Sequence, residues 1–362
     1  MLNSGLISPI RTQPAAQRGE TSEATAMKDR LLFLISTPRS GSTLMQRMLG
    51  SHSEIMTAPE PHLVTPLAHL GYYDTVDAAP FDHINGAEAI RLFVDSLPRK
   101  EEDYLDALRA YADTLYGRML EPANKRYFLD KTPAYALSLP FLSKLYPEAK
   151  YVVLTRHPLA VFSSYANSFF DGDWEAAHKY NRVVERYVPA IAHFLRERPT
   201  PLTHVKYEEL VASPESHLER VFAFLGLEHQ PEAVDYGDNF AQKKAGPGDP
   251  IGVTQHRRPV TSSTHKWAAE LVHDNKKRAL AEQMIARCSD EDLAIWGWPR
   301  ERVFDALSEV GDKAPPKPAR NNYTFQRRVM LALKKDIHNR PHGAVVKKLR
   351  YYCDVLLRDS LG

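Results

Sequence analysis

The feature that most constrains this chain is a strand–turn–helix pattern at residues 31–46, which read LLFLISTPRSGSTLMQ. The apolar run 31–35 predicts a buried strand, and LMQRMLGSH after the turn predicts a helix. A helix that follows such a turn directs its first backbone N–H groups and the positive end of its dipole at one point. Arg39 lies in the turn, and Ser40, Ser42 and Thr43 add hydroxyl donors. We therefore expect this segment to bind a phosphate-type anion.

The turn lacks the Walker A pattern G-x-x-x-x-G-K-[ST]. It contains one glycine, Gly41, and it has no lysine that would reach a terminal phosphate. An ordinary turn with polar caps is the simpler interpretation of the same residues, because serine and threonine favour helix N-termini for local reasons. The two interpretations differ in what the rest of the chain should contain.

The segment TPRSGSTLMQRMLGSH, residues 37–52, resembles the 5′-phosphosulfate loop of the sulfotransferase superfamily. Its arginine before Ser-Gly is similar to that of the Golgi tyrosylprotein and carbohydrate enzymes. It also resembles bacterial sulfotransferases, including the domains of curacin and olefin-synthase polyketide pathways. The resemblance extends over about residues 30–270. It implies 3′-phosphoadenosine 5′-phosphosulfate (PAPS) as sulfuryl donor and adenosine 3′,5′-bisphosphate (PAP) as product.

A second anion-binding pattern occurs in YVVLTRHPLAVFSSYANSF, residues 151–169. A strand delivers Arg156 at its carboxyl end, and Ser164 follows eight positions later. Arginine supplies a planar fork that matches phosphate oxygens, although a surface ion pair with a carboxylate would also explain Arg156. The spacing R-x-P-x-x-x-x-x-S resembles the 3′-phosphate site of the superfamily. That resemblance implies that Arg156 and Ser164 bind the 3′-phosphate of the donor.

Two later segments resemble further parts of the donor site. Tyr207 in THVKYEEL is similar to a family tyrosine near the adenine, where an aromatic face can stack on a purine. The run QHRRPVTSSTHKW, residues 255–267, resembles the late loop that folds over the donor phosphates, which implies roles for Arg257, Arg258 and Lys266. The alternatives are a tyrosine that caps a strand end and a solvated basic loop.

The acceptor side is predicted from two segments. Glu60 in MTAPEPHLVTPL lies nineteen residues after Gly41, and the tyrosylprotein enzymes have their proposed base at the same distance. A hydroxyl that attacks sulfur must lose its proton, so we expect Glu60 as base and keep His62 as the second candidate. FLDKTPAYAL resembles the family D-K-T-P segment, which implies that Lys131, with Arg39, stabilises the sulfuryl group and the departing phosphate. A plain surface ion pair is the alternative for Lys131.

The order of elements predicts an α/β, P-loop-like domain with a central parallel sheet flanked by helices. We expect strands at 31–36, 127–129, 151–154 and 203–206, and helices at about 43–50, 139–145, 174–198 and 214–225. Helical spacing over 85–120, interrupted at Pro98, predicts a mostly helical acceptor-side insertion at 62–125. In such sheets, ligands bind beyond the carboxyl ends of the strands.

The ends of the chain differ in composition from its middle. Residues 1–29 read as a disordered leader, 30–310 as the sulfotransferase domain, and 311–362 as a Pro-rich linker with a basic helical tail. From residue 320 the tail has ten Lys or Arg against three Asp, while the whole chain has a net charge of only +2. Membrane-surface contact, packing on the domain and a dimer contact all remain open for this tail.

Net charge, cysteine content and the length of apolar runs indicate which partners and which cellular compartment to expect. The net charge of +2 gives no reason to expect a nucleic-acid partner, and the two cysteines lack a metal-ligand pattern and suggest a reducing compartment. With no apolar run of membrane-spanning length, we expect a cytoplasmic, bacterial enzyme. We expect metal-independent in-line transfer to a hydroxyl of a small molecule or a carrier-protein-bound acyl chain. A P-loop small-molecule kinase and an inactive nucleotide-binding interaction module are the alternatives.

Overall fold

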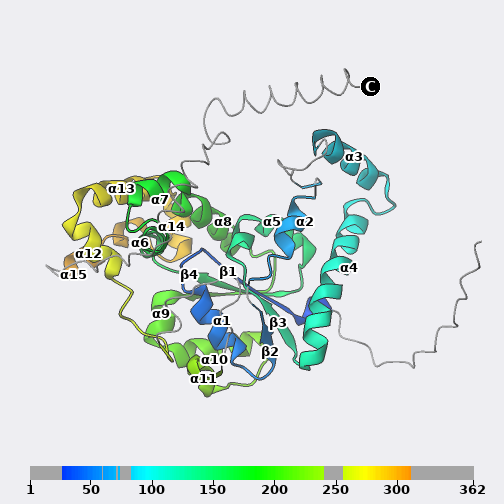
Figure 1. The fold of residues 1–362 in the computed structure, drawn as a ribbon, viewed down its shortest axis with the longest axis horizontal. Coiled ribbons are helices and arrows are strands. Elements are labelled where there is room, and N and C mark those ends of the chain that lie inside the picture. Colours follow the sequence, from blue (N-terminus) through cyan, green and yellow to red (C-terminus); the bar gives the residue numbers. More distant parts are fainter. Residues whose placement is uncertain (1–26, 59, 71, 74–82, 240–255, 311–362) are drawn as a thin grey trace, which may run out of the picture.

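The computed structural model describes residues 27–58, 60–70, 72–73, 83–239 and 256–310 (Figure 1). Of the leader expected at 1–29, residues 1–26 lie outside the described residues, as do the linker and tail expected at 311–362. Met27–Arg30 forms a short 3-10 helix, η1, directly before the first strand. Within the described ranges, no helix is both long enough and apolar enough to cross a membrane.

Five parallel strands form one sheet in the order β2-β3-β1-β4-β5. The strands are β1 (Leu31–Ser36), β2 (Ile55–Thr57), β3 (Tyr127–Asp130), β4 (Lys150–Thr155) and β5 (Leu202–Lys206). The expected parallel sheet is therefore confirmed. The sequence pattern missed β2, because three residues are too few to show a strand periodicity.

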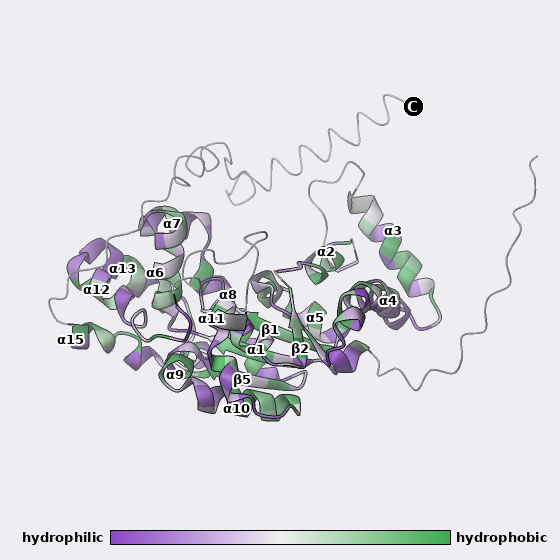
Figure 2. Cartoon of the chain, turned by 60° about the horizontal axis from the view of Figure 1, so that its bottom comes forward, coloured by the Kyte–Doolittle hydropathy of each residue, from purple (hydrophilic) through white to green (hydrophobic). Residues whose placement is uncertain are grey.

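Both faces of the sheet are buried. Alternate residues of β1 point to opposite sides, with Leu31 and Phe33 in one apolar cluster and Leu32 and Leu34 in the other. The helices α1 (Ser42–Gly50), α9 (Tyr207–Ala212) and α10 (Pro214–Leu225) cover one face, and α4 (Glu101–Leu120), α5 (Leu139–Leu145), α6 (Pro158–Phe169) and α8 (Val183–Glu197) cover the other (Figure 1). Figure 2 shows this hydrophobic centre between helices that are polar on their outer sides.

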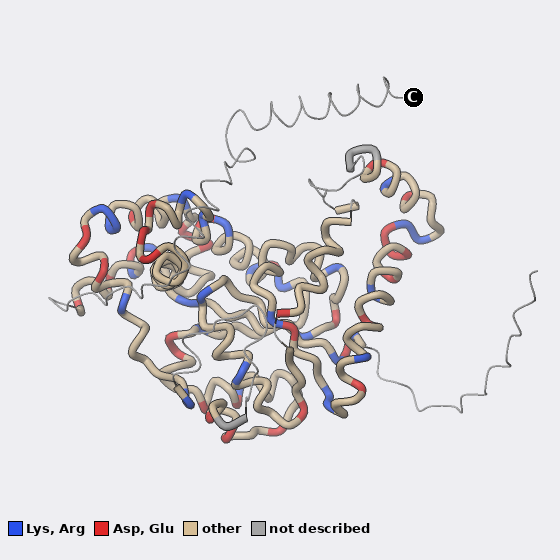
Figure 3. Tube along the Cα trace, viewed as in Figure 1, with Lys and Arg blue, Asp and Glu red and all other residues tan. Residues whose placement is uncertain are grey.

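The remaining elements surround this core. They are the helices α2 (Val64–Ala68), α3 (His83–Ser96), α7 (Trp174–Tyr180), α11 (Tyr236–Asn239), α12 (Lys266–His273), α13 (Asn275–Ala286), α14 (Asp290–Trp296) and α15 (Ala306–Val310), and the 3-10 turns η2 (Glu121–Ala123), η3 (Pro133–Leu137), η4 (Pro231–Val234) and η5 (Arg300–Arg302). Charged residues gather on these outer helices and occur in the strands only at their ends (Figure 3).

Two helical expectations have different outcomes. The break expected at Pro98 is present, since α3 ends at Ser96 and α4 begins at Glu101. The single helix expected at 174–198 is wrong, because the chain forms α7 and α8 with a break between them. Asn181 there adopts an extended conformation, with φ −149° and ψ 119°, and interrupts the helical hydrogen bonds.

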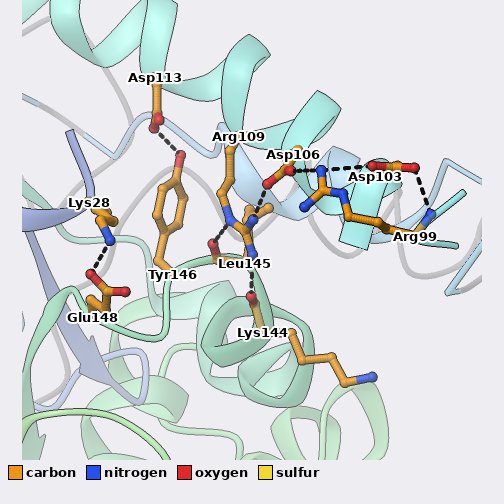
Figure 4. A network of polar contacts seen from close by, with 10 residues as sticks. All are labelled: Lys28, Arg99, Asp103, Asp106, Arg109, Asp113, Lys144, Leu145, Tyr146 and Glu148. Carbon is orange, nitrogen blue, oxygen red and sulfur yellow. Dashed lines mark hydrogen bonds and ion pairs between the residues drawn. The ribbon is translucent and has the colours of Figure 1, made fainter. Parts of the chain in front are cut away.

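Polar contacts join α4 to the C-terminal end of α5 and to Tyr146, which follows it (Figure 4). Arg109 donates from Nε to the carbonyl oxygen of Leu145 over 2.7 Å and from a terminal nitrogen to that of Lys144 over 3.1 Å. The Tyr146 hydroxyl donates to Asp113 over 2.7 Å. These bonds satisfy the last carbonyls of α5, and they hold α4 beside the acceptor-side segments.

Candidate active site

Every strand of the sheet ends beside a residue that the sequence placed in the site. Arg39 follows β1, Glu60 follows β2, Lys131 follows β3, Arg156 follows β4 and Tyr207 follows β5. Because all five strands are parallel, their carboxyl ends meet at one edge of the sheet. A cavity of about 600 Å³ lies at this edge. Ten predicted residues line it: Arg39, Gly41, Ser42, Thr43, Glu60, His62, Arg156, Ser164, Tyr207 and Lys266.

The loop between β1 and α1 has the geometry of an anion cradle. Gly41 has φ +93°, and a Cβ atom there would lie 2.4 Å from the Tyr207 ring, so only glycine fits. No side chain caps α1, which leaves the first N–H groups of the helix available at Ser42 and Thr43. Ser40 is different, since it is buried and donates to the carbonyl oxygen of Thr37 over 2.9 Å. It shapes the loop and does not line the cavity.

Arg156 is a buried cation without a carboxylate partner among the described residues. It donates to the carbonyl oxygens of Arg39 over 3.1 Å and Ser263 over 3.0 Å, and its guanidinium lies 4.4 Å from the centre of the Tyr207 ring. Its Nε is buried and has no hydrogen-bond acceptor. Burial lowers the pKa of Arg156, although arginine stays charged in proteins. A buried charge of this kind fits an anionic ligand at the cavity wall.

Arg39 and Ser164 meet across the same wall. Arg39 has φ +67°, and its Nε donates to the Ser164 hydroxyl over 3.3 Å. Its guanidinium also lies 5.9 Å from the Phe169 ring centre. The two predicted anion sites are therefore continuous, since Arg39 contacts Arg156 through its carbonyl oxygen and Ser164 through its side chain.

The three residues that the sequence predicts for the acceptor side form one cluster. Lys131 retains 1% of its side-chain surface, and its Nζ lies 2.5 Å from Glu60 Oε1. The other carboxylate oxygen, Glu60 Oε2, lies 3.6 Å from His62 Nε2. Glu60 and His62 line the cavity, whereas Lys131 lies behind Glu60. The carboxylate thus stands between a buried lysine and a more exposed imidazole.

A network of hydroxyl groups around Asp130 holds this cluster in place, and the sequence suggests that Asp130 positions the loop of Lys131. Asp130 is fully buried and accepts hydrogen bonds from the hydroxyls of Tyr116, Thr132 and Tyr135 over 2.6, 2.9 and 2.9 Å. Burial raises the pKa of Asp130. The Tyr135 hydroxyl oxygen also accepts a hydrogen bond from the backbone N–H of Val64 over 3.0 Å. The Thr132 hydroxyl oxygen accepts one from the backbone N–H of His62 over 3.4 Å. The segment that carries Glu60 is thereby tied to β3.

The late basic loop enters the site only in part. The Tyr207 hydroxyl shares a hydrogen bond of 3.1 Å with Ser263, and Lys266 lines the cavity. Arg257 and Arg258 do not line it. The Arg258 guanidinium instead forms ion pairs with Glu215 and, at 3.2 Å, with Asp235. The structure therefore brings one of the three predicted cations of this loop to the cavity.

Glu270 is a second positioning group, and the sequence did not reveal it. Its buried carboxylate accepts from the Ser163 hydroxyl over 2.8 Å, from Asn167 over 2.6 Å and from the Trp174 indole over 3.1 Å. These bonds join α12, which begins at Lys266, to α6, which carries Ser164. An acidic residue on the apolar stripe of the KWAAELVH helix was the available signal.

We compared the chain with protein families, curated proteins and solved structures. The model of the "Sulfotransferase family" matches residues 32–231, which is more than half of the chain. Nodulation protein NoeE of Sinorhizobium fredii is 29% identical over 222 residues, covering 55% of this chain and 50% of its own length. The alignment thus spans only half of that relative.

Two further proteins are similar over more of their length. Protein-tyrosine sulfotransferase 1 of Danio rerio is 26% identical over 308 residues, which cover 80% of each chain. The sulfotransferase domain of the Synechococcus PCC 7002 olefin synthase is 24% identical, with a TM-score of 0.45, over 70% of this chain and 94% of that one. On the strength of the family match over residues 32–231, this chain belongs to the sulfotransferase family of transferase enzymes.

Proposed function

We propose that this enzyme transfers a sulfuryl group from PAPS to an acceptor hydroxyl by in-line displacement. The observation that carries the proposal is the continuity of the two anion sites, in which Arg156 donates to the carbonyl oxygen of Arg39 over 3.1 Å. A donor with phosphates at both its 3′ and 5′ positions needs two such sites on one cavity wall. Gly41 and the uncapped N-terminus of α1 fit a 5′-phosphosulfate, while Arg156 and Ser164 fit a 3′-phosphate.

The roles of the remaining residues follow from their positions. Lys131 and Arg39 supply positive charge where the phosphate departs, and Lys266 adds a further positive charge to the cavity lining. The packing of Tyr207 on Gly41 and Arg156 supports its predicted place near the adenine. Arg257 and Arg258 have no support from the cavity for a part in phosphate binding.

Glu60 takes the proton in the proposed reaction. The acceptor oxygen forms a bond to sulfur while the bond between sulfur and the 5′-phosphate oxygen breaks, and the electron pair of that bond leaves with PAP. The acceptor proton passes to the Glu60 carboxylate, which lines the cavity beside Lys131. His62, 3.6 Å from Glu60 Oε2, is the alternative base. The acceptor is a small molecule or an acyl chain, free or bound to a carrier protein.

Ligand binding tests this proposal against its alternatives. We expect PAP to raise the melting temperature and ATP with magnesium to leave it unchanged, because the loop lacks the Walker lysine. Stabilisation by ATP–magnesium alone would favour a kinase. Labelled PAPS offered with a broad panel of alcohols, phenols and sugars then measures turnover, and PAP binding without any turnover would favour an inactive binding module.

A further inference from the structure

Tyr187 is exceptional among the buried tyrosines of the described chain. Its side chain is 5% exposed, and its hydroxyl forms no hydrogen bond with any described residue. By contrast, seven other buried tyrosines use their hydroxyls in hydrogen bonds: Tyr116, Tyr127, Tyr135, Tyr146, Tyr151, Tyr207 and Tyr236. Fully enclosed polar groups are almost always hydrogen-bonded, and the Tyr187 hydroxyl is not fully enclosed, because it is reached from the cavity that Tyr187 lines.

Packing alone does not explain a tyrosine at this position. The buried stripe of α8 is largely aliphatic, and the neighbours of Tyr187 on it are Val183, Val184, Val188 and Ile191. Phenylalanine would fill the same space among these side chains, so their apolar packing gives no role to the hydroxyl. Tyr187 is, however, part of the cavity wall. Its hydroxyl is therefore available to a molecule in the cavity.

The place of Tyr187 in the fold assigns it to the acceptor side. Tyr187 belongs to the apolar cluster on the face of the sheet that α8 covers. Tyr207, which packs on Gly41, belongs to the cluster on the opposite face. The helix α8 packs against α6 and against η3, whose first residues, Pro133 and Ala134, follow Lys131 closely and also line the cavity. The contact with η3 places α8 beside the segment that follows Lys131.

We propose that the Tyr187 hydroxyl binds the acceptor by donating a hydrogen bond to a second oxygen near the attacking hydroxyl. Pro133, Ala134 and Phe169 give the surrounding wall an apolar character, which suits an acceptor with an aliphatic or aromatic body. Burial raises the pKa of Tyr187, so its hydroxyl keeps its proton and acts as a donor at neutral pH. The inference rests on the proposed sulfotransferase reaction and specifies the class of acceptor.

The test combines one variant with a matched series of acceptors. Tyr187→Phe removes only the hydroxyl, and Tyr111→Phe, at an exposed position of α4 outside the cavity, is the control. The acceptors are octan-1-ol and its 2-, 3- and 4-methoxy derivatives, each with one hydroxyl that can be sulfated. We expect the wild type to prefer at least one methoxy derivative over octan-1-ol by about threefold to tenfold in kcat/KM, the size of one hydrogen bond.

In Tyr187→Phe that preference should disappear, while PAP affinity measured by calorimetry and the melting temperature stay unchanged. Equal preferences in both proteins would overturn the inference. A tenfold loss of PAP affinity with intact acceptor preference would also overturn it, since the hydroxyl would then serve the donor. A wild type that binds PAP but sulfates none of these alcohols would contradict the acceptor class. A wild type that does not bind PAP would instead refute the proposed function.

Discussion

The Nζ atom of Lys131 lies 2.5 Å from Glu60 Oε1, so the cation and the carboxylate that the reaction needs form one ion pair. Lys131 is almost fully enclosed, whereas Glu60 retains 15% of its side-chain surface and lines the cavity. The carboxylate is thus the member of the pair that an acceptor can reach. In the proposed reaction, this pair lies beside the acceptor oxygen and the departing phosphate.

Glu60→Gln tests the base directly. We expect kcat to fall by about 100-fold to 10,000-fold, the usual contribution of a general base, because the amide cannot take the acceptor proton. PAP affinity should stay within a factor of two, and Glu102→Gln on the exposed side of α4 serves as control. Unchanged turnover in a folded Glu60→Gln protein, together with a loss in His62→Asn, would transfer the role to His62.

Lys131→Met tests whether the ion pair stabilises the fold as well as the reaction. The variant leaves Glu60 without its partner in a largely buried place, so we expect unfolding in urea to cost about 2 kcal/mol less than in the wild type. Adding Glu60→Gln removes the unpaired charge and should restore part of that stability without restoring turnover. Additive losses in the double variant would show that the two side chains are not coupled.

Gly41→Ala tests the anion cradle. A methyl group would lie 2.4 Å from the Tyr207 ring at φ +93°, so we expect a loss of about 1–3 kcal/mol in stability and a clear rise in the PAP dissociation constant. Gly117→Ala in α4 is the matched control, since its Cβ would have ordinary contacts at 3.6 and 3.7 Å. That change should stabilise the helix by about 0.5–1 kcal/mol. Wild-type PAP binding by Gly41→Ala would argue against the cradle.

His157 should make the fold sensitive to acid. Burial lowers the pKa of His157 to about 3 from 6.5, while its Nε2 donates to the carbonyl oxygen of Val303 over 2.9 Å and its ring stacks on Trp267. The unfolded state therefore binds an additional proton between these pH values, and stability falls as the pH decreases from 6.5 toward 3. In His157→Phe, the slope should be smaller by up to about 1.4 kcal/mol per pH unit.

Urea unfolding at pH 6.5, 5.5 and 4.5 measures this slope. His157→Phe will start from a lower stability, because the bond to Val303 is lost, so the comparison concerns the slope and not the absolute value. Parallel curves for the two proteins would exclude His157 as the source of the acid sensitivity.

Chelation tests the expected independence from metal ions. Arg39, Arg156, Lys266 and the N-terminus of α1 together place positive charge along the cavity, which is the contribution that magnesium makes in phosphoryl transfer. We expect turnover with labelled PAPS to be the same with and without EDTA. Activity that is lost in chelator and recovered with magnesium would contradict this expectation.

Local patterns predicted most of the fold. The runs in β1 and β4 are apolar throughout because both faces of the sheet are covered, and the breaks at Pro98 and at Gly226, with φ +70°, follow from the backbone preferences of single residues. The interruption at Asn181 gave no such signal. Asparagine is tolerated within helices, and this break accompanies the separate packing of α7 and α8.

The sequence by itself determined the turn between the first strand and helix, four of the five strands, and the residue that follows each of those four, because these depend on neighbours along the chain. Only the tertiary structure decided that Glu60 pairs with Lys131, that Glu270 joins α12 to α6, that Arg258 pairs outside the cavity, and that Tyr187 opens into it. The contacts of Glu60 with Lys131, of Glu270 with Ser163 and of Arg258 with Asp235 join residues that are more than 20 and up to 107 positions apart. Their existence depends on how the helices pack across the sheet, and a linear pattern does not contain that information.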